Sequence, residues 1–182
     1  NMKIAVISDI HGNMQALSAV LKNIKEENCD KIFCLGDLAM AGPEPARTID
    51  KIQELIKTTD FTCIQGNTDE MIVNCDNQMI HMLEENNPVM AHALECDATV
   101  VSEEQKQFLK NLPPQKELEI EGVKILLVHG SPRKNNENIY CDLKIEEVEE
   151  MIKGTNANII FCGHTHVPCG YQTNTRQTAV SY

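Results

Sequence analysis

Two aspartates, one asparagine and four histidines follow short apolar segments of the chain at nearly regular places. These candidate metal ligands are Asp9, His11, Asp37, Asn67, His129, His164 and His166. Carboxylate, imidazole and amide oxygen together suit divalent Mn, Fe, Ni or Zn, with Mg as an alternative. Seven side chains are more than one such ion needs, so two ions are the natural number. Two ions about 3.5–4 Å apart can clamp a phosphoryl group during displacement.

Glycines adjoin most of these candidate ligands. They are Gly12, Gly36, Gly66, Gly130 and Gly163. Because glycine has no Cβ, it lets the backbone turn sharply and come close to a ligand. The sequence therefore predicts tight turns around a bound group.

The elements that must position these residues alternate along the first part of the chain. Segments 3–8, 31–35 and 62–65 are short, apolar and typical of strands, whereas 14–24 and 49–56 have the 3.6-residue periodicity of amphipathic helices. This alternation predicts an α/β fold with parallel pairing and right-handed crossovers. In such sheets, ligands bind outside the carboxyl ends of the strands, where the candidate ligands stand.

The rest of the chain predicts an insertion and a second set of strands. Residues 69–112 are predicted to form a mostly helical insertion, which Pro88 interrupts. The further elements expected are a hairpin over 116–128 turning at Glu121 and Gly122, a helix over 145–153, a strand over 158–162, and a hairpin over 170–182 turning at Asn174 and Thr175. No linker divides the sequence, so we expect one domain over 2–182.

Composition restricts the class of partner. The chain of 182 residues is 42% hydrophobic and 24% charged, with a formal net charge of −11. Binding to a long nucleic acid or to an anionic membrane needs clustered cations, so neither is expected. The apolar runs are far shorter than the roughly 18 residues of a membrane span. Eight scattered cysteines without a C-x-x-C pair indicate a reducing, cytoplasmic location. Composition does not predict the oligomeric state.

The order of the candidate ligands carries a resemblance to a family. D-x-H, G-D, G-N, a lone His with Gly, and G-H-x-H follow one another from Asp9 to His166. In these five blocks the chain resembles the calcineurin-like metallophosphoesterase superfamily, and in particular its small bacterial and archaeal phosphodiesterase-like branch. The resemblance implies a four-layer αββα sandwich, in which helices flank two mixed β-sheets. It also implies further strands and a loop beyond Tyr182.

The resemblance also implies roles for the seven residues. One metal would be held by Asp9, His11 and His166, and the other by Asn67, His129 and His164, with Asp37 bridging the two. The residues expected to be catalytic are Asp37, Asn67, His129 and His164. In this family pattern, a hydroxide shared by the two ions attacks phosphorus in line.

One position departs from the family pattern. Many members have a histidine after G-N that assists the leaving group or binds the phosphate, whereas this chain has Thr68. Threonine is not an acid near neutral pH, and a missing general acid typically costs a factor of about 10²–10⁴. The chain should therefore act on good leaving groups or use another donor.

Other polar residues near the motifs have two interpretations each. Arg133 could pair with a phosphate oxygen or be a solvated loop residue. Asn13 could contact substrate, although it better suits the cap of the following helix. Thr68 is included with them as a candidate substrate contact. Asp69 could orient a ligand, but capping the next helix is favoured.

Together these features predict a dinuclear metal-dependent phosphoesterase that cleaves small phosphodiesters or nucleotides. The alternatives with the same metals are a protein Ser/Thr or phosphomonoester phosphatase and a dinucleoside-polyphosphate hydrolase. A non-catalytic protein-interaction scaffold is a third hypothesis. The complete ligand set disfavours it.

Overall fold

The computed structural model describes residues 2–173 and 178–181, and its first sheet consists of three parallel strands. The elements in this part are β1 (Ile4–Ile7), α1 (Met14–Glu26), β2 (Lys31–Cys34), α2 (Pro45–Thr58) and β3 (Phe61–Cys63). A helix connects each strand to the next, which lets neighbouring strands run in the same direction. The sequence prediction of parallel pairing here is confirmed. The described strands of this sheet are all parallel, in place of the mixed sheet that the family resemblance implied.

The second sheet is mixed and has the order β4-β5-β6-β8-β7. Its elements are β4 (Gln115–Ile120), β5 (Val123–Val128), β6 (Ile159–Cys162), β7 (Cys169–Gln172) and β8 (Thr178–Ser181), with α7 (Ile145–Ile152) between β5 and β6. β4 and β5 form the predicted hairpin, and Glu121 and Gly122 both have positive φ, 51° and 79°. A two-residue turn with this geometry matches the twist of the strands. β7 and β8 also pair antiparallel, while the predicted turn at 174–175 lies outside the described residues.

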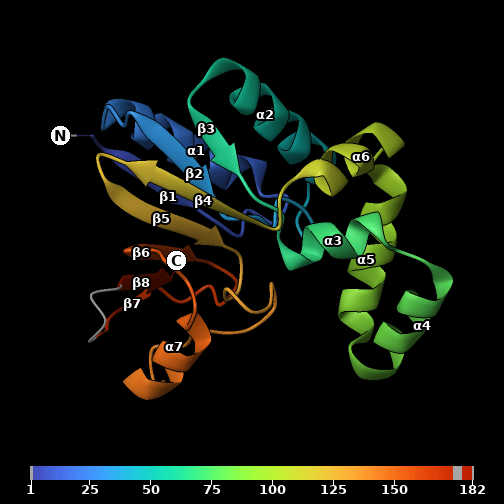
Figure 1. Cartoon of the computed structure of the whole chain (residues 1–182). Helices are drawn as coiled ribbons and strands as arrows, with labels where there is room; N and C mark the ends of the chain where they lie inside the picture. The colour runs from blue at the N-terminus through green and yellow to red at the C-terminus, as the bar shows by residue number, and fades with distance from the viewer. Residues whose placement is uncertain (1, 174–177, 182) are drawn as a thin grey trace.

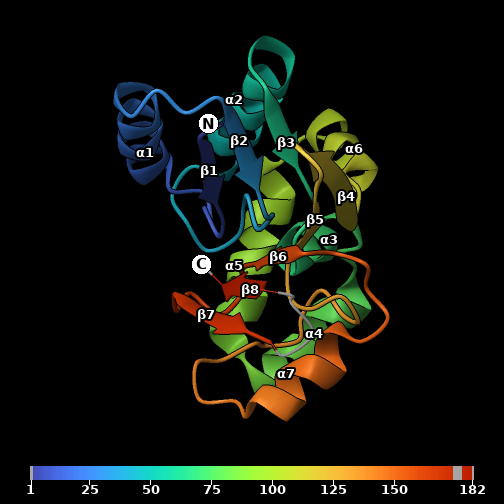
Figure 2. The same cartoon turned by 60° about the vertical axis from the view of Figure 1, so that its left-hand side comes forward.

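The two sheets pack face to face between helices. Figure 1 shows α1 and α2 above the first sheet, the second sheet beneath it, and α7 below. Phe33, Leu35 and Leu127 belong to the apolar cluster between the sheets, and Val148 of α7 packs with Ile160 on the other face of the second sheet. Turning the molecule keeps this order, with α7 at the far side from α2 (Figure 2). The predicted four-layer αββα architecture is therefore confirmed.

Four helices between β3 and β4 form the insertion, which lies at one end of the sandwich (Figure 1). They are α3 (Asn67–Val73), α4 (Asn77–Asn86), α5 (Pro88–Val100) and α6 (Glu103–Asn111). The predicted interruption at Pro88 is confirmed, because α4 ends at Asn86 and Asn87 caps α5 through its side chain. The insertion begins two residues earlier than predicted, since the first turn of α3 starts at Asn67.

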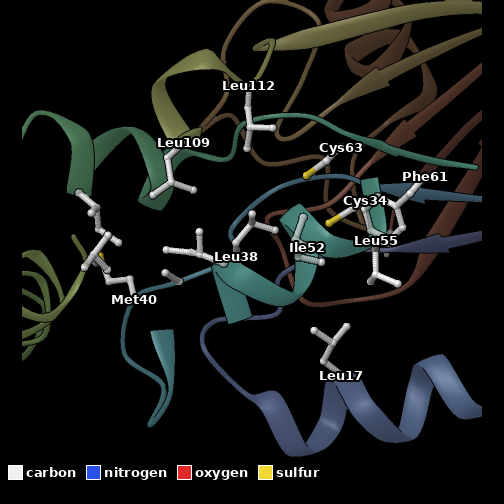
Figure 3. Packing of buried hydrophobic residues seen from close by; sticks show 14 of the residues in the cluster. Leu17, Cys34, Leu38, Met40, Ile52, Leu55, Phe61, Cys63, Leu109 and Leu112 are labelled. Carbon is white, nitrogen blue, oxygen red and sulfur yellow. The ribbon is translucent and has the colours of Figure 1, made fainter. Parts of the chain in front are cut away.

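The largest apolar cluster joins this insertion to the first layer. Leu17 of α1, Ile52 of α2 and Leu109 of α6 are buried in it (Figure 3). Burial of each such aliphatic side chain stabilises the fold by about 1.5–3 kcal/mol. Because Leu109 of α6 lies in this cluster, the insertion is part of the packed core. No helix in the described ranges is both long and apolar enough to cross a bilayer.

Candidate metal centre

All seven predicted ligands lie close together at the carboxyl ends of the strands. Asp9 and His11 follow β1, Asp37 follows β2, Asn67 begins α3 just after β3, His129 follows β5, and His164 and His166 follow β6. Backbone hydrogen bonds hold these loops against one another, for example from the Asp9 N–H to the Gly36 carbonyl and from the Gly163 N–H to the His129 carbonyl. Strands that pair in parallel thus deliver their terminal residues to one place.

Six of these side chains form two groups of three metal-binding atoms. The inner group is Asp37, His129 and His164, and the outer group is Asp9, His11 and His166. Within each group, one ligand atom from every residue lies within 4.8 Å of the other two. The groups differ in burial: Asp37 and His129 are buried, whereas the imidazole of His166 is exposed.

In the inner group, His129 is fixed on both sides of its ring. Its Nδ1 lies 2.7 Å from the carbonyl oxygen of Leu35, to which it donates, so Nε2 is directed at the ligand site. This Nε2 lies 3.2 Å from Asp37 Oδ2 and 2.9 Å from the Oδ1 of Asn67. The ring centroid of His164 is 5.2 Å from that of His129. The Oδ1 of Asn67 therefore lies beside the inner group.

In the outer group, two imidazoles face one carboxylate. His11 Nε2 and His166 Nε2 are 3.1 Å apart, and Asp9 Oδ1 lies 3.3 Å from His166 Nε2. The Nδ1 of His11 is 3.1 Å from the Met40 carbonyl oxygen, which again directs Nε2 toward the site. The outer group has the same construction as the inner group, with a different backbone carbonyl behind the ring.

The two groups share a boundary. Asp37 Oδ2 of the inner group is 3.7 Å from His11 Nε2, and Asp9 Oδ1 of the outer group is 3.9 Å from His129 Nε2. The second oxygen of Asp9 accepts a hydrogen bond from the His164 backbone N–H at 3.0 Å. Asp37 thus stands within reach of ligands from both groups, which is the position that a bridging carboxylate needs.

The donor set fits divalent cations. Asp9 Oδ1 is buried and accepts no hydrogen bond from the described residues. Because Nδ1 of His11 donates to the Met40 carbonyl, its Nε2 carries a lone pair, 3.1 Å from His166 Nε2, that a cation beside the two rings would accept. Nitrogen ligands about 2.1 Å from one ion stand about 3 Å apart, close to the observed separation.

The charges of the inner group depend on each other. Burial lowers the pKa of the His129 imidazole, but the hydrogen bond and charge of Asp37 outweigh burial and raise it to about 9. Burial likewise raises the pKa of Asp37, yet His129 brings it below its usual value. The pKa of His164 is lowered, first by burial and then by the charge of His129. Positive charge beside Asp37 is therefore favoured, and a divalent cation provides it without a proton.

The backbone is strained at the ligands themselves. Positive φ angles occur at Asp9 (55°), His11 (48°), Asp37 (55°), His164 (72°) and His166 (56°). Left-handed conformations are uncommon for residues other than glycine, and they cluster at functional sites, where the surrounding structure holds them. Five of the seven candidate ligands thus have this conformation, which four other non-glycine residues in the described part of the chain share.

Two glycines let the backbone of one loop come close to a candidate ligand side chain of another. A Cβ on Gly66 would lie 2.0 Å from Asp37 Oδ1, and a Cβ on Gly163 would lie 2.7 Å from Asp9 Oδ2. Neither distance is sterically allowed for a side chain. Both aspartates thus depend on glycine in the neighbouring loop.

Asp69 both caps α3 and supports the Asp37 loop. Its fully buried carboxylate accepts backbone N–H groups from Gly66, Asp37 and Leu38, each at 2.9 Å. Burial and the charge of Asp37 raise the pKa of Asp69 to about 7, against these hydrogen bonds. The favoured interpretation, capping, is confirmed, and the orienting alternative is also realised through the backbone.

Thr68 has its polar groups committed within the protein. Its backbone N–H donates to Asp37 Oδ1 at 2.9 Å, and its hydroxyl donates to the Ala39 carbonyl at 3.0 Å. To donate to a phosphate oxygen, this hydroxyl would have to give up its bond to Ala39. The backbone N–H of Thr68 helps to position Asp37.

The other two candidate substrate contacts also have partners within the protein. Arg133 makes a bidentate pair with Glu137, through Nε at 3.0 Å and Nη2 at 2.6 Å, so this edge of its guanidinium is committed to a carboxylate. Asn13 Oδ1 accepts the Ala16 N–H at 2.9 Å and caps α1, which confirms the favoured interpretation. Glu137 and Ala16 are close in the sequence to Arg133 and Asn13, but the sequence alone does not show which polar groups pair.

Sequence reasoning did not identify two residues that support the site, Asp97 and Met40. Asp97 of α5 is buried and accepts the Met40 N–H at 2.7 Å, and Met40 in turn accepts from His11. A signal was present, because Asp97 stands on the apolar face of its helix together with Ala91 and Leu94. A carboxylate is almost never fully buried unless it has a partner.

Comparison with known proteins identifies the family to which the chain belongs. A profile of the calcineurin-like phosphoesterase superfamily domain matches residues 2–181. The chain belongs to this superfamily.

Relatives are found among archaeal and bacterial proteins. An uncharacterized protein of Methanocaldococcus jannaschii is 34% identical over 165 residues, which are 91% of this chain and 63% of that protein. The crystal structure of a hypothetical protein from Pyrococcus horikoshii OT3 has a TM-score of 0.88 at 24% identity, covering 100% of this chain and 76% of that one. A metallophosphoesterase from Sphaerobacter thermophilus has a TM-score of 0.75 at 25% identity, covering 99% and 75%. The chain thus spans less than two thirds of the curated relative's length.

Proposed function

We propose that this phosphoesterase-family chain is a dinuclear metal-dependent hydrolase of small phosphodiesters or nucleotides. The observation that carries the proposal is the pair of adjoining donor groups, each complete with a carboxylate and two imidazoles. Asp37 Oδ2 lies 3.2 Å from a histidine nitrogen of the inner group and 3.7 Å from one of the outer group. One ion per group, with Asp37 between them, uses all six residues of the two groups, and Asn67 beside the inner group is the seventh ligand.

The proposed ligand sets follow the resemblance. Asp9, His11 and His166 would hold one ion, Asn67, His129 and His164 the other, and Asp37 would bridge them. When bound, such ions polarise phosphoryl oxygens and lower the pKa of a coordinated water. The chain's own contribution is to fix the ligands: backbone carbonyls orient the rings of His11 and His129, and the N–H groups around Asp37 and Asp9 hold their carboxylates.

The charges support a small anionic substrate. A chain with a net charge of −11 repels polyanions, whereas two divalent ions beside the exposed outer group would attract a single phosphate ester locally. Mn, Fe, Ni or Zn suits these ligands, and Mg is an alternative. We therefore propose a small phosphate ester as the partner and neither a long nucleic acid nor a membrane.

The leaving group is the second part of the proposal. The hydroxyl of Thr68 donates to Ala39 and is not an acid, so position 68 supplies no proton to a departing alkoxide. We expect substrates whose leaving groups need no protonation, such as aryl phosphates or the phosphoanhydride bonds of nucleotides, to be cleaved faster than alkyl esters by about 10²-fold or more.

The test combines metal analysis with two chromogenic esters. Protein loaded with Mn²⁺ should contain about two ions per chain and should hydrolyse bis-p-nitrophenyl phosphate faster than p-nitrophenyl phosphate. The His129→Ala variant should lose the inner ion and, with it, the activity. His81→Ala is the matched control, because His81 is exposed on α4 and pairs with Glu84.

Three other results would point to a different function. Faster cleavage of the monoester would favour a phosphomonoester phosphatase with the same metals. A verified metal-loaded protein that cleaves neither ester would overturn the catalytic proposal. Fewer than about one ion per chain under Mn²⁺ supplementation would favour the non-catalytic scaffold.

A further inference from the structure

One residue of the helical insertion is connected to a candidate ligand through a single intervening residue. The Asp97 carboxylate of α5 accepts the Met40 N–H at 2.7 Å, and the Met40 carbonyl oxygen lies 3.1 Å from His11 Nδ1. The N–H and the carbonyl of one residue therefore join the insertion to the outer group. Met40 and Asp97 are 57 positions apart in the sequence.

Met40 is held in a conformation that needs support. Its φ is 85° and that of the next residue, Ala41, is 67°. Left-handed geometry at consecutive non-glycine residues costs roughly 1–3 kcal/mol each and persists where surrounding contacts impose it. The side chain of Met40 is buried in the apolar cluster shared with the insertion, and Figure 3 shows it at the edge of that cluster.

The inner group is oriented differently. The carbonyl behind His129 belongs to Leu35, which directly follows β2 and lies in the apolar layer between the two sheets. Asp97 has no part in that hydrogen bond. A change at Asp97 should therefore act on the ring of His11 and leave that of His129 in place.

We propose that Asp97 is a positioning residue that sets the metal affinity of the outer group through Met40 and His11, and that the insertion thereby controls one of the two metal positions. The inference rests on the proposed function, because it assumes that both groups bind metal. Hydrogen-bond partners behind a metal-ligating histidine fix its tautomer and orientation, and their loss typically weakens metal binding by about 10–100-fold.

The test is calorimetric titration of Mn²⁺ into the metal-free full chain. Wild type should show two classes of site. Asp97→Ala should weaken one class by about 10–100-fold and leave the other within about twofold. Asp97→Asn keeps an oxygen acceptor but loses its charge, so the same class should weaken by an intermediate factor of about two to ten. Glu95→Gln, an exposed position on the same helix, should change neither class.

A second comparison identifies the class that changes. His166→Ala should abolish the outer class, since His166 belongs to that group alone. Adding Asp97→Ala to this variant should leave the remaining class within about twofold, because mutations that act on one site do not add once that site is lost. Thermal unfolding followed by circular dichroism should show that the variants remain folded.

The outcomes separate the inference from the proposed function. Equal weakening of both classes, or unchanged affinity in Asp97→Ala and Asp97→Asn, would overturn the role of Asp97. If Asp97→Ala does not fold, selective weakening of one class in Asp97→Asn decides in favour, and its absence decides against. Wild-type protein that binds no Mn²⁺ would instead refute the proposed function.

Discussion

The inner and outer groups of the candidate metal centre contain the same residue types but differ in environment. Asp37 and His129 of the inner group are 2% and 0% exposed, whereas the side chain of His166 in the outer group is 57% exposed. The inner group is supported by neighbouring loops of the sandwich and by the start of α3. The outer group depends on the more distant contact through Met40 to α5.

Groups with the same ligand types can differ in how strongly they hold an ion. A buried group surrounded by hydrogen-bonded loops is preorganised and screened from water, while an exposed histidine must be ordered when it binds. We therefore expect the inner group to retain its ion more strongly and the outer group to exchange with solvent. The predictions below test this contrast.

The largest effect is expected at the boundary between the groups. Asp37→Asn should lower kcat/KM on bis-p-nitrophenyl phosphate by more than about 100-fold, because loss of a mere hydrogen-bond partner of a ligand already costs about 10–100-fold. Metal content should fall at both positions, as measured by mass spectrometry of the bound metal. Asp142→Asn, at an exposed turn, is the matched control. Retained activity with two bound ions would show that Asp37 is not a shared ligand.

The contrast between the groups is sharpened by a pair of histidine variants. His166→Ala should lose one ion per chain and about 10–100-fold of activity, while the inner ion stays bound. His129→Ala should lose the inner ion and also reduce thermal stability, since a fully buried ring and its bond to Leu35 are removed. Metal analysis and thermal denaturation of both variants measure this. Identical losses in the two would contradict an inner and an outer group of unequal strength.

The hydrogen bonds that Asp69 accepts beside the inner group should contribute to folding stability. Asp69→Ala removes the acceptor for three buried N–H groups, and each unsatisfied group costs about 1–3 kcal/mol. Allowing for water that enters the space, we expect the free energy of unfolding to fall by about 3 kcal/mol in urea denaturation of the metal-free protein. Asp76→Ala removes a single accepted N–H at the exposed cap of α4 and should cost about 1 kcal/mol. Equal losses would argue against a special role for Asp69.

The smallest effect is expected away from both groups. Gly122→Ala places a side chain at φ +79° in the β4–β5 turn, where nothing lies within 4 Å of the added Cβ. Only the conformational strain remains, so stability should fall by about 1 kcal/mol. Metal content and kcat/KM should equal those of wild type. If the metal content changed, overall folding stability, rather than the contacts around the ligands, would determine metal binding.

Much of the fold could be predicted because its signals are local. The alternation of strands and helices up to residue 65, the turn at Glu121 and Gly122, and the break at Pro88 each depend on residues close in sequence. The seven candidate ligands could be found for a related reason: parallel strands bring their carboxyl ends together, so residues that follow them converge. The family motif order gave the same set.

The partners of the remaining polar groups could not be predicted in this way. One edge of the Arg133 guanidinium pairs with Glu137, and the hydroxyl of Thr68 donates to a backbone carbonyl 29 positions away. Hydrogen bonds depend on tenths of an ångström and on angle, which residue type and spacing do not specify.

Residue chemistry and short-range periodicity were enough to identify the candidate metal ligands and the strands that precede them along the chain. The burial of one group, the exposure of the other, and the link from Asp97 through Met40 to His11 are seen only in the folded chain. Burial and long-range hydrogen bonds arise when layers distant in the chain pack against each other, and that packing sets the solvent exposure and orientation of every ligand.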